Sequence, residues 1–439
     1  MRDPSLLNVL ANALMAGEQD VRSIVSRIKR AAGKRGLPAL AARYHAAFSG
    51  KVRPRRRDVI AFLQQDAGVP HIHSRGAQQI SIRHRLTEPQ TMLPVAAAQD
   101  WPIPAIASVG ELCEWLRVTP GELEWFADLK GLNRKSGKSA LGHYSYRLAA
   151  KRSGDFRMIE APKTRLKLLQ RQILTEILDK IPAHEAAHGF VKGRSIQSFA
   201  APHVGQRVVL RMDLRDFFPS IFAARIQAFF RTAGYPDAIA SFLCGICTHA
   251  VPEMVWREHR ELLGVEKAFE LRRLYARRHL PQGAPTSPSL ANLCAYRLDA
   301  RLAGVARSAG ATYTRYADDL AFSGGDAFNR QVERFSDLVG AILLEEGFQP
   351  HFRKTRIMRQ GARQRLAGMV VNRHPNIGRA EFDALKALLT NCVRHGAESQ
   401  NREGVADFRL HLNGRVGFAE TVNAAKGARL RRIFKQILW

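Results

Sequence analysis

The sequence is short of acidic residues and of cysteine, and it contains no long apolar run. Asp and Glu number 39 against 68 Lys and Arg, which gives a formal net charge of +29 over 439 residues. Such an excess favours a polyanionic partner, most often a nucleic acid. No apolar stretch approaches the roughly 20 residues that a membrane-spanning helix needs, so no membrane partner is expected. Residues 1–18 also show no cleavable signal pattern.

The five cysteines are odd in number and irregular in spacing, so they do not suggest a disulfide framework. They fit a reducing compartment, and the expected location is the cytoplasm. Cys244 and Cys247 could form half of a zinc site with His249 nearby. No second cysteine pair follows and the flanking residues are apolar, so a buried helix is the preferred interpretation.

The length allows about three domains. In residues 1–66, apolar residues recur at helical spacing between basic runs, which predicts a helical basic module. Its cations indicate either contact with phosphates or an ordinary solvated face. Residues 67–107 are poor in charge and rich in Pro, Ala and Gln, which predicts a linker. Residues 251–279 predict a basic helical insertion.

Two adjacent carboxylates, Asp318 and Asp319, lie in an alternating and partly aromatic stretch that includes Tyr316 and Phe322. This alternation predicts two short strands with the acids at or beside the turn between them. Adjacent acids are costly unless a cation neutralises them, and oxygen ligands suit Mg²⁺ or Mn²⁺. An ordinary solvated hairpin turn is the alternative.

Two further motifs precede the acid pair. Residues 208–221 predict an apolar strand that delivers Asp213 at its end, with aromatic residues directly beyond it. Residues 280–288, Leu-Pro-Gln-Gly-Ala-Pro-Thr-Ser-Pro, predict a rigid turn that opens a helix. The order Asp, Pro-Gln-Gly and Tyr-Ala-Asp-Asp resembles the palm motifs of reverse transcriptases, and the longer strings are similar to the retron branch of the bacterial enzymes.

The resemblance covers about residues 109–439 and implies an RNA-directed DNA polymerase shaped like a right hand. The implied fold is α+β, with an antiparallel palm sheet and a helical N-terminal extension. The expected parts are fingers with N-terminal helices at residues 108–204, a palm at 205–372 that includes the insertion, and a thumb at 373–439.

The resemblance also implies roles for individual residues. Asp213 and Asp318 would hold two Mg²⁺ ions, or Mn²⁺, with help from the Leu214 carbonyl, while Asp319 would tune or share the metal site. Phe218 would exclude a nucleotide 2′-hydroxyl, unless it is ordinary core. The other implied contacts are Lys151, Arg157, Gln282 and Lys354 to the dNTP, and Tyr316 and Gly368 to primer and template.

Retron enzymes copy part of a structured non-coding RNA and take part in phage defence. The implied partners are therefore such an RNA, an RNA/DNA duplex, dNTPs and an effector protein. Two positions depart from the retron pattern, because Phe199 replaces the usual Asn and Ala367 the usual Thr. The alternatives are another defence-associated or group II intron-like reverse transcriptase, or a non-catalytic RNA-binding scaffold. The three acids placed to bind metal argue against the scaffold, because a protein that only binds RNA does not need them.

Overall fold

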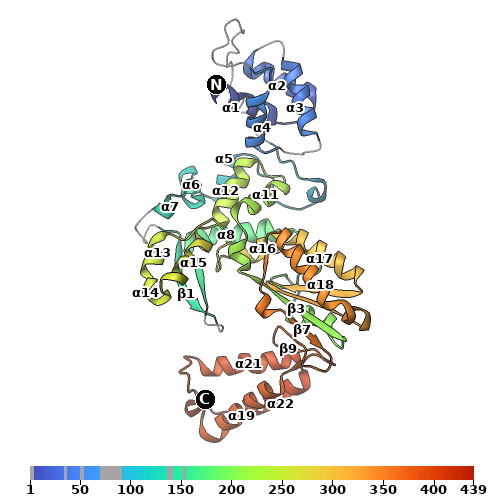
Figure 1. Ribbon diagram of the computed structural model, residues 1–439. Helices are drawn as coiled ribbons and strands as arrows, with labels where there is room; N and C mark the ends of the chain where they lie inside the picture. Colours follow the sequence, from blue (N-terminus) through green and yellow to red (C-terminus); the bar gives the residue numbers. More distant parts are fainter. Residues whose placement is uncertain (1–3, 34–36, 50–53, 70–90, 136–141, 152–154) are drawn as a thin grey trace. The chain divides into compact units, whose positions relative to one another are not determined.

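A computed structural model of the chain describes residues 4–33, 37–49, 54–69, 91–135, 142–151 and 155–439 (Figure 1). The chain forms two compact units. The first comprises residues 1–181 and 222–286, and the second comprises residues 182–221 and 287–439. The palm expected at residues 205–372 is therefore divided between the two units, and each unit is described by itself.

The first unit begins with four helices that share one apolar core. Leu10, Leu14, Ile24 and Leu63 are fully buried in it, because apolar residues at helical spacing leave one face of each helix to be covered. The second helix starts at Asp20, whose carboxylate accepts a hydrogen bond from the backbone N–H of Ser23. The helices are α1 (Pro4–Met15), α2 (Val21–Ala32), α3 (Leu37–Phe48) and α4 (Arg56–Gln65).

Residues 91–107, which the sequence predicts to belong to a linker, pack against helix α11 (Ala223–Thr232). The backbone N–H of Leu93 donates to the carbonyl of Gly234 at 2.9 Å, and the ring of Trp101 stacks on Phe229 with centroids 6.3 Å apart. The Tyr235 hydroxyl donates to the carbonyl of Pro104. These contacts make the segment part of the first unit. Residues 70–90 of the expected linker lie outside the described residues.

The rest of the first unit is a hairpin surrounded by helices. Strands β1 (Tyr144–Ala150) and β2 (Phe156–Pro162) pair antiparallel. Cys244 and Cys247 are buried in α12, which confirms the preferred interpretation of that segment as buried helix. The other elements are η1 (Ala96–Ala98), α5 (Val109–Leu116), α6 (Pro120–Ala127), α7 (Leu132–Lys135), α8 (Thr164–Glu176), η3 (Leu178–Lys180), α12 (Asp237–Cys247), α13 (Glu253–Glu258), α14 (Arg260–Leu263) and α15 (Val265–Tyr275).

The second unit is built on an antiparallel sheet with strand order β4-β5-β3-β6, in which β7 also pairs with β3. Helices α17 and α18 lie against the sheet (Figure 1). The α+β fold with an antiparallel palm sheet is thereby confirmed. The strands are β3 (Val208–Arg215), β4 (Ala311–Tyr316), β5 (Asp319–Gly324), β6 (Gln349–Pro350) and β7 (Arg356–Arg359). The helices are α9 (Ile196–Ala200), η4 (Ala201–His203), α10 (Phe217–Ser220), α16 (Ser287–Cys294), α17 (Tyr296–Ser308), α18 (Asp326–Glu345) and η5 (Phe352–Lys354).

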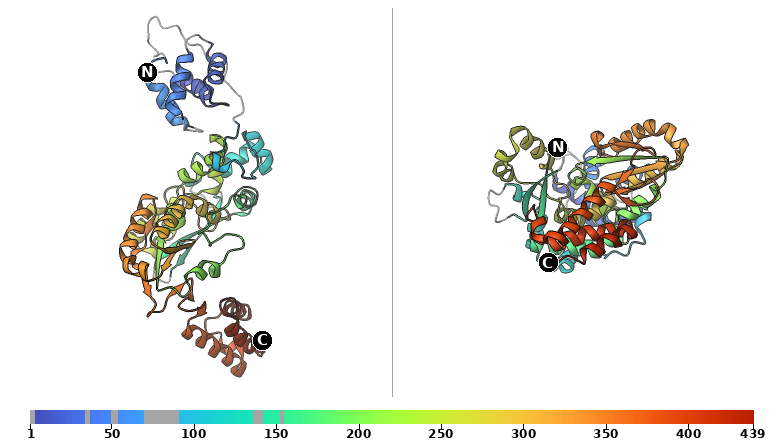
Figure 2. Two further views of the ribbon diagram at one scale, coloured as in Figure 1. Left: turned by 90° about the vertical axis from the view of Figure 1, so that its right-hand side faces the viewer. Right: turned by 90° about the horizontal axis from the view of Figure 1, so that it is seen from below.

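The C-terminal part of the second unit is helical and follows a small three-stranded sheet. Helices α19, α21 and α22 lie side by side around buried Leu389, Leu412 and Leu430 (Figure 2). A Cβ at Gly427 would lie 2.2 Å from the Cα of Glu420, so only glycine allows α22 to approach α21 this closely. The elements are β8 (Arg365–Leu366), β9 (Met369–Val370), β10 (Asn376–Ile377), α19 (Arg379–His395), α20 (Ala397–Gln400), α21 (Phe408–Val422) and α22 (Ala424–Phe434).

Among the described residues, no helix is both long enough and apolar enough to cross a membrane. The five cysteines are free thiols and all are buried.

Candidate active site

The palm sheet brings the three acids to one end. Asp213, near the end of β3, is directly paired with Asp319, the first residue of β5. Asp318 lies in the turn that joins β4 to β5. The alternating sequence predicted this hairpin with its acids at the turn, and the structure confirms it. The backbone N–H of Leu214 donates to the carbonyl of Asp318 at 2.9 Å, so β3 and the turn are also joined by main chain.

Asp319 is held by Arg211, which is two residues before Asp213 and therefore on the same face of β3. The Arg211 guanidinium donates to both carboxylate oxygens of Asp319, each at 2.8 Å. Burial raises the pKa of Asp319, and the neighbouring Arg211 acts in the opposite direction. Because both oxygens already accept from a cation, Asp319 is less available for metal binding than its neighbours.

Asp213 and Asp318 form the negative centre of the site whose carboxylates are not paired with Arg211. Burial, together with the charges of Asp213 and Asp319, raises the pKa of Asp318 to about 6. The Lys354 ammonium lies 2.8 Å from Asp213 Oδ1, and a cation binding there would displace this contact. Lys354 itself is exposed. The Asp213 and Asp318 carboxylates therefore concentrate negative charge that a bound cation would stabilise.

The described residues contain no group of three or more His, Cys, Asp and Glu side chains arranged to hold a metal ion. The donors that fit are the carboxylates of Asp213 and Asp318, which lie close enough for the charge of Asp213 to raise the pKa of Asp318. Mg²⁺ commonly binds through one or two carboxylates and keeps several waters, together with substrate phosphates. This donor set fits Mg²⁺ better than a metal that needs a complete protein cage.

A buried ion pair fixes the turn that carries Asp318. Arg315 and Asp299 are both fully buried, and the guanidinium donates to the two carboxylate oxygens at 2.7 and 2.6 Å. The same guanidinium donates to Asn292 Oδ1 at 3.0 Å and to the carbonyl of Ala317 at 3.1 Å. Ala317 has φ +55°, a left-handed conformation that is unusual for alanine. The ion pair therefore stabilises a strained residue directly before Asp318.

The loop around Gly189 supports the same turn from its other side. The backbone N–H of His188 donates to the carbonyl of Arg315, and Asn292 Nδ2 donates to the carbonyl of Gly189. A Cβ at Gly189 would lie 2.6 Å from the backbone nitrogen of Ala317, so no side chain fits there. No role for Arg315, Asp299 or Asn292 was expected from sequence. The available signal was a charged residue, Arg315, inside the short strand predicted directly before the acid pair.

Three aromatic rings, those of Phe218, Phe190 and Tyr316, lie next to one another close to the turn that carries Asp318. Phe218 is half-buried, and its ring lies 6.2 Å from that of Phe190. Phe190 in turn lies 6.3 Å from Tyr316. Phe190 is 51% exposed and has φ +60°, so a large apolar ring is held at the surface in a costly backbone conformation. Sequence reasoning missed Phe190, although its position between Gly189 and Val191 in a glycine-rich stretch was a signal.

The two departures from the retron pattern have structural explanations. Phe199 is fully buried, packs against Tyr316 with ring centroids 5.8 Å apart, and accepts a hydrogen bond from Thr314 at its carbonyl. Ala367 and Gly368 form the left-handed turn between β8 and β9, with φ +45° and +86°. Phe199 is therefore part of the core behind the β4–β5 hairpin, and Ala367 takes a turn position.

Lys151, Arg157 and Gln282 belong to the first unit, whereas the acids belong to the second. Lys151 follows β1 and lies 3.7 Å from Asp155, and Arg157 is exposed on β2. The carbonyl of Gln282 accepts from the backbone N–H of Glu160 at 2.9 Å. The Pro-Gln-Gly turn is thus fixed to the strand that carries Arg157.

Comparison with known proteins gives one family match and several relatives. Residues 149–382 match the family described as "Reverse transcriptase (RNA-dependent DNA polymerase)". The retron Mx65 reverse transcriptase of Myxococcus xanthus is 42% identical over 297 residues, which are 66% of this chain and 64% of that protein. The retron Mx162 reverse transcriptase of the same organism is 36% identical over 331 residues, 73% of this chain and 65% of that protein.

This chain therefore spans slightly less than two thirds of the length of these curated relatives. Among solved structures, a telomerase from Candida albicans with a fragment of telomeric RNA has a TM-score of 0.33 and 12% identity, over 67% of this chain and 63% of that chain.

Proposed function

Because this chain belongs to the reverse transcriptase family, as a retron-type member, we propose that it extends a primer with dNTPs on an RNA template. The membership expected from the palm motifs is confirmed by the family match and by the relatives. The observation that carries the proposed activity is the geometry of the palm. Asp213 and Asp318 lie together at the end of a sheet, and an extensive network of hydrogen bonds fixes the turn between β4 and β5.

In this proposal Asp213 and Asp318 hold two Mg²⁺ ions, with the Leu214 carbonyl as a further oxygen; Mn²⁺ would suit the same donors. Bound Mg²⁺ supplies stabilisation of charge on the attacking and leaving oxygens of an in-line displacement. Asp319, paired with Arg211, sets the charge and position of the neighbouring acids. Lys354, which contacts Asp213 here, would contact the leaving pyrophosphate.

The remaining assignments concern the substrates. Lys151 and Arg157 are proposed to bind the triphosphate, and Gln282 to contact the incoming nucleotide. Phe218 is proposed to exclude the 2′-hydroxyl of a ribonucleotide, with Phe190 supporting its ring. Tyr316 and the turn at Gly368 are proposed to contact primer and template. The helices α19, α21 and α22 are proposed as a thumb that holds duplex.

The proposed template is a structured non-coding RNA, because the curated relatives are named retron reverse transcriptases. The polymerase would then hold an RNA/DNA duplex during synthesis. We further propose that it acts in the cytoplasm, consistent with five free thiols, and with an effector protein in phage defence.

An extension assay tests this proposal. The purified chain, a primed RNA template, dNTPs and Mg²⁺ should yield complementary DNA that is sensitive to DNase and absent when a chelator removes the metal. Ribonucleotides in place of dNTPs should be poor substrates. RNA binding without synthesis under all metal conditions would instead indicate a non-catalytic RNA-binding scaffold.

A further inference from the structure

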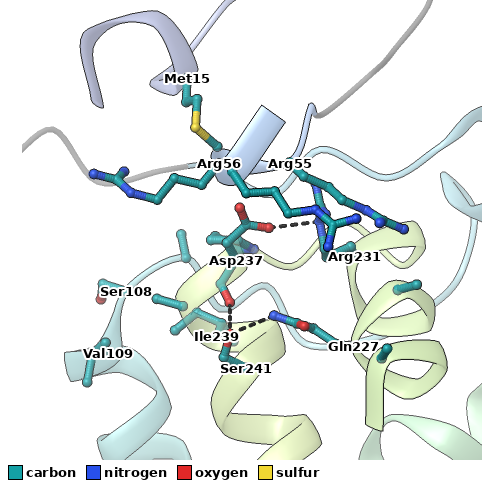
Figure 3. Close-up of a pocket in the computed structure, with 16 residues that line it drawn as sticks. Met15, Arg55, Arg56, Ser108, Val109, Gln227, Arg231, Asp237, Ile239 and Ser241 are labelled. Atoms are coloured by element: carbon teal, nitrogen blue, oxygen red, sulfur yellow. Dashed lines mark hydrogen bonds and ion pairs between the residues drawn. The ribbon is translucent and has the colours of Figure 1, made fainter. Parts of the chain in front are cut away.

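The first unit contains a pocket of about 690 Å³ that none of the proposed catalytic or dNTP-binding residues lines. One side of it is formed by Arg55, Arg56 and Arg57, at the start of α4. The other side is formed by Arg231 of α11 and by Asp237 at the start of α12 (Figure 3). The pocket therefore joins the N-terminal helical module to helices that pack beside residues 91–107.

The pocket is strongly cationic. Among the described residues that line it there are four arginines and a single acid, Asp237. That acid is already paired with Arg231, whose guanidinium lies 2.8 Å from it. Arg55 and Arg57 are exposed. Positive charge in this hollow thus exceeds negative charge by three, which favours an anionic occupant.

Both sides of the pocket are held in place by specific hydrogen bonds. Arg56 donates to Asn12 Oδ1 at 2.5 Å and to Asn8 Oδ1 at 3.1 Å, which fastens the start of α4 to α1. On the other side, Gln227 donates to Ser241 Oγ at 2.8 Å, and Ser241 donates to the carbonyl of Asp237 at 2.6 Å. Arg55 and Arg57 are therefore presented by a fixed support.

Three helices begin at this pocket, which adds to its positive potential. Arg55 is the N-cap of α4, Ser108 is the N-cap of α5, and Asp237 is the first residue of α12. Helix N-termini carry partial positive charge and bind phosphate groups in many proteins. The arginines give the principal attraction, and the helix ends act in the same direction.

We propose that this pocket binds backbone phosphates of single-stranded RNA, as a contact separate from the polymerase site. The RNA as partner rests on the proposed function. A pocket of this volume with four arginines suits an extended polyanion, because several phosphates can be neutralised at once and their counterions released. The basic run at Arg55–Arg57 is thereby assigned to phosphate contact instead of an ordinary solvated face.

Salt titrations with matched charge variants test the proposal. A labelled oligouridine of about 40 nucleotides is titrated with the full chain and with its Arg55→Ala/Arg57→Ala and Arg22→Ala/Lys29→Ala variants, at several salt concentrations. Arg22 and Lys29 are exposed residues of the same module outside the pocket, so the second variant loses the same charge. Extension of a short primed RNA by each variant reports on folding and on the polymerase site.

The pocket variant should bind the RNA more weakly, and its slope of log affinity against log salt should be shallower by about 1.4, corresponding to two single-strand phosphate contacts. The control pair should leave the slope near that of the wild type, and all three proteins should extend the short primer equally.

Equal losses of RNA affinity in both variants would show that the RNA responds only to the overall positive charge of the module, and would overturn the proposal. Unchanged slopes in both would also overturn it and would indicate another occupant, such as an acidic protein segment. Failure of all three proteins to extend the primer would count against the polymerase activity and not against the pocket.

Discussion

The ion pair between Arg211 and Asp319 makes the three neighbouring acids differ in how available each carboxylate is to a metal ion. Both carboxylate oxygens of Asp319 accept from a guanidinium, whereas the Asp213 carboxylate contacts the exposed ammonium of Lys354 and Asp318 has a raised pKa. A divalent cation therefore competes with the exposed Lys354 ammonium at Asp213 and with a proton at Asp318. Binding at Asp319 would require breaking a bidentate pair.

Replacement of Arg211 by Met should weaken metal binding without abolishing chemistry. Without the guanidinium, the Asp319 carboxylate would lose its fixed orientation and the positions of Asp213 and Asp318 would change; residues that orient metal ligands typically contribute about 10–100-fold in affinity or activity. The measurement is the Mg²⁺ concentration that gives half-maximal dNTP addition. Arg211→Lys keeps the charge and should lie between the wild type and Arg211→Met. A full loss of activity in Arg211→Met at saturating Mg²⁺, equal to that of Asp318→Asn, would contradict this division of roles.

Phe218 is expected to govern the choice of sugar. Its half-buried ring is supported by Phe190, so Phe218→Ala would leave room for a 2′-hydroxyl and raise ribonucleotide incorporation relative to deoxyribonucleotide incorporation. Single-nucleotide kinetics with matched ribo- and deoxyribonucleotides measure this ratio. Phe217→Leu, a change in the buried neighbouring ring, is the control for loss of packing. An unchanged ratio in Phe218→Ala would assign Phe218 to the core.

At the scale of elements, the turn between β4 and β5 depends on segments that are distant in sequence. Arg315 reaches Asp299 and Asn292 on helices α17 and α16, and the loop at Gly189 lies against the turn itself. Removing one partner of a buried ion pair typically costs about 3–5 kcal/mol, so this network contributes to the stability of the palm as well as to its geometry.

Gly189→Ala should therefore reduce catalysis more than RNA binding. The added Cβ would lie 2.6 Å from the backbone nitrogen of Ala317 and would displace the turn that carries Asp318. A displacement of about 1 Å can cost on the order of 100-fold in rate. Gly304→Ala in helix α17 is the control, because a Cβ there meets nothing within 4 Å. The measurements are the single-turnover rates and RNA affinities of both variants. A wild-type rate for Gly189→Ala would show that the turn does not depend on this contact.

The parts of the site that sequence could predict are those encoded locally. An alternating stretch around Asp318 and an apolar run ending at Asp213 are enough to predict a hairpin and a strand with acids at their ends. The support for the turn could not be predicted in this way, because Asp299, Asn292 and Gly189 reach Arg315 and Ala317 only through tertiary folding. The aromatic contact of Phe190 has the same origin.

At the scale of the whole molecule, the composition indicated a polyanionic partner but not where it binds. The arginine-lined pocket combines residues 55–57 with residue 231, and no local pattern connects two segments so far apart. The linker expected at residues 67–107 also differs in part from the structure. Residues 91–107 are apolar enough to pack on α11, and their Pro and Ala content alone did not distinguish a packed extended segment from a free one.

The assigned chemistry is tested most directly by the single-turnover rate of dNTP addition to a primed RNA, measured with the wild type, Asp318→Asn and Asp337→Asn. Asp337 is an exposed acid on α18, so its variant controls for the loss of one charge. Asp318→Asn should lower the rate by at least about 100-fold while RNA affinity stays near that of the wild type, because affinity comes mainly from phosphate contacts elsewhere. Asp337→Asn should match the wild type. Wild-type-like addition by Asp318→Asn would contradict the assignment of the palm acids.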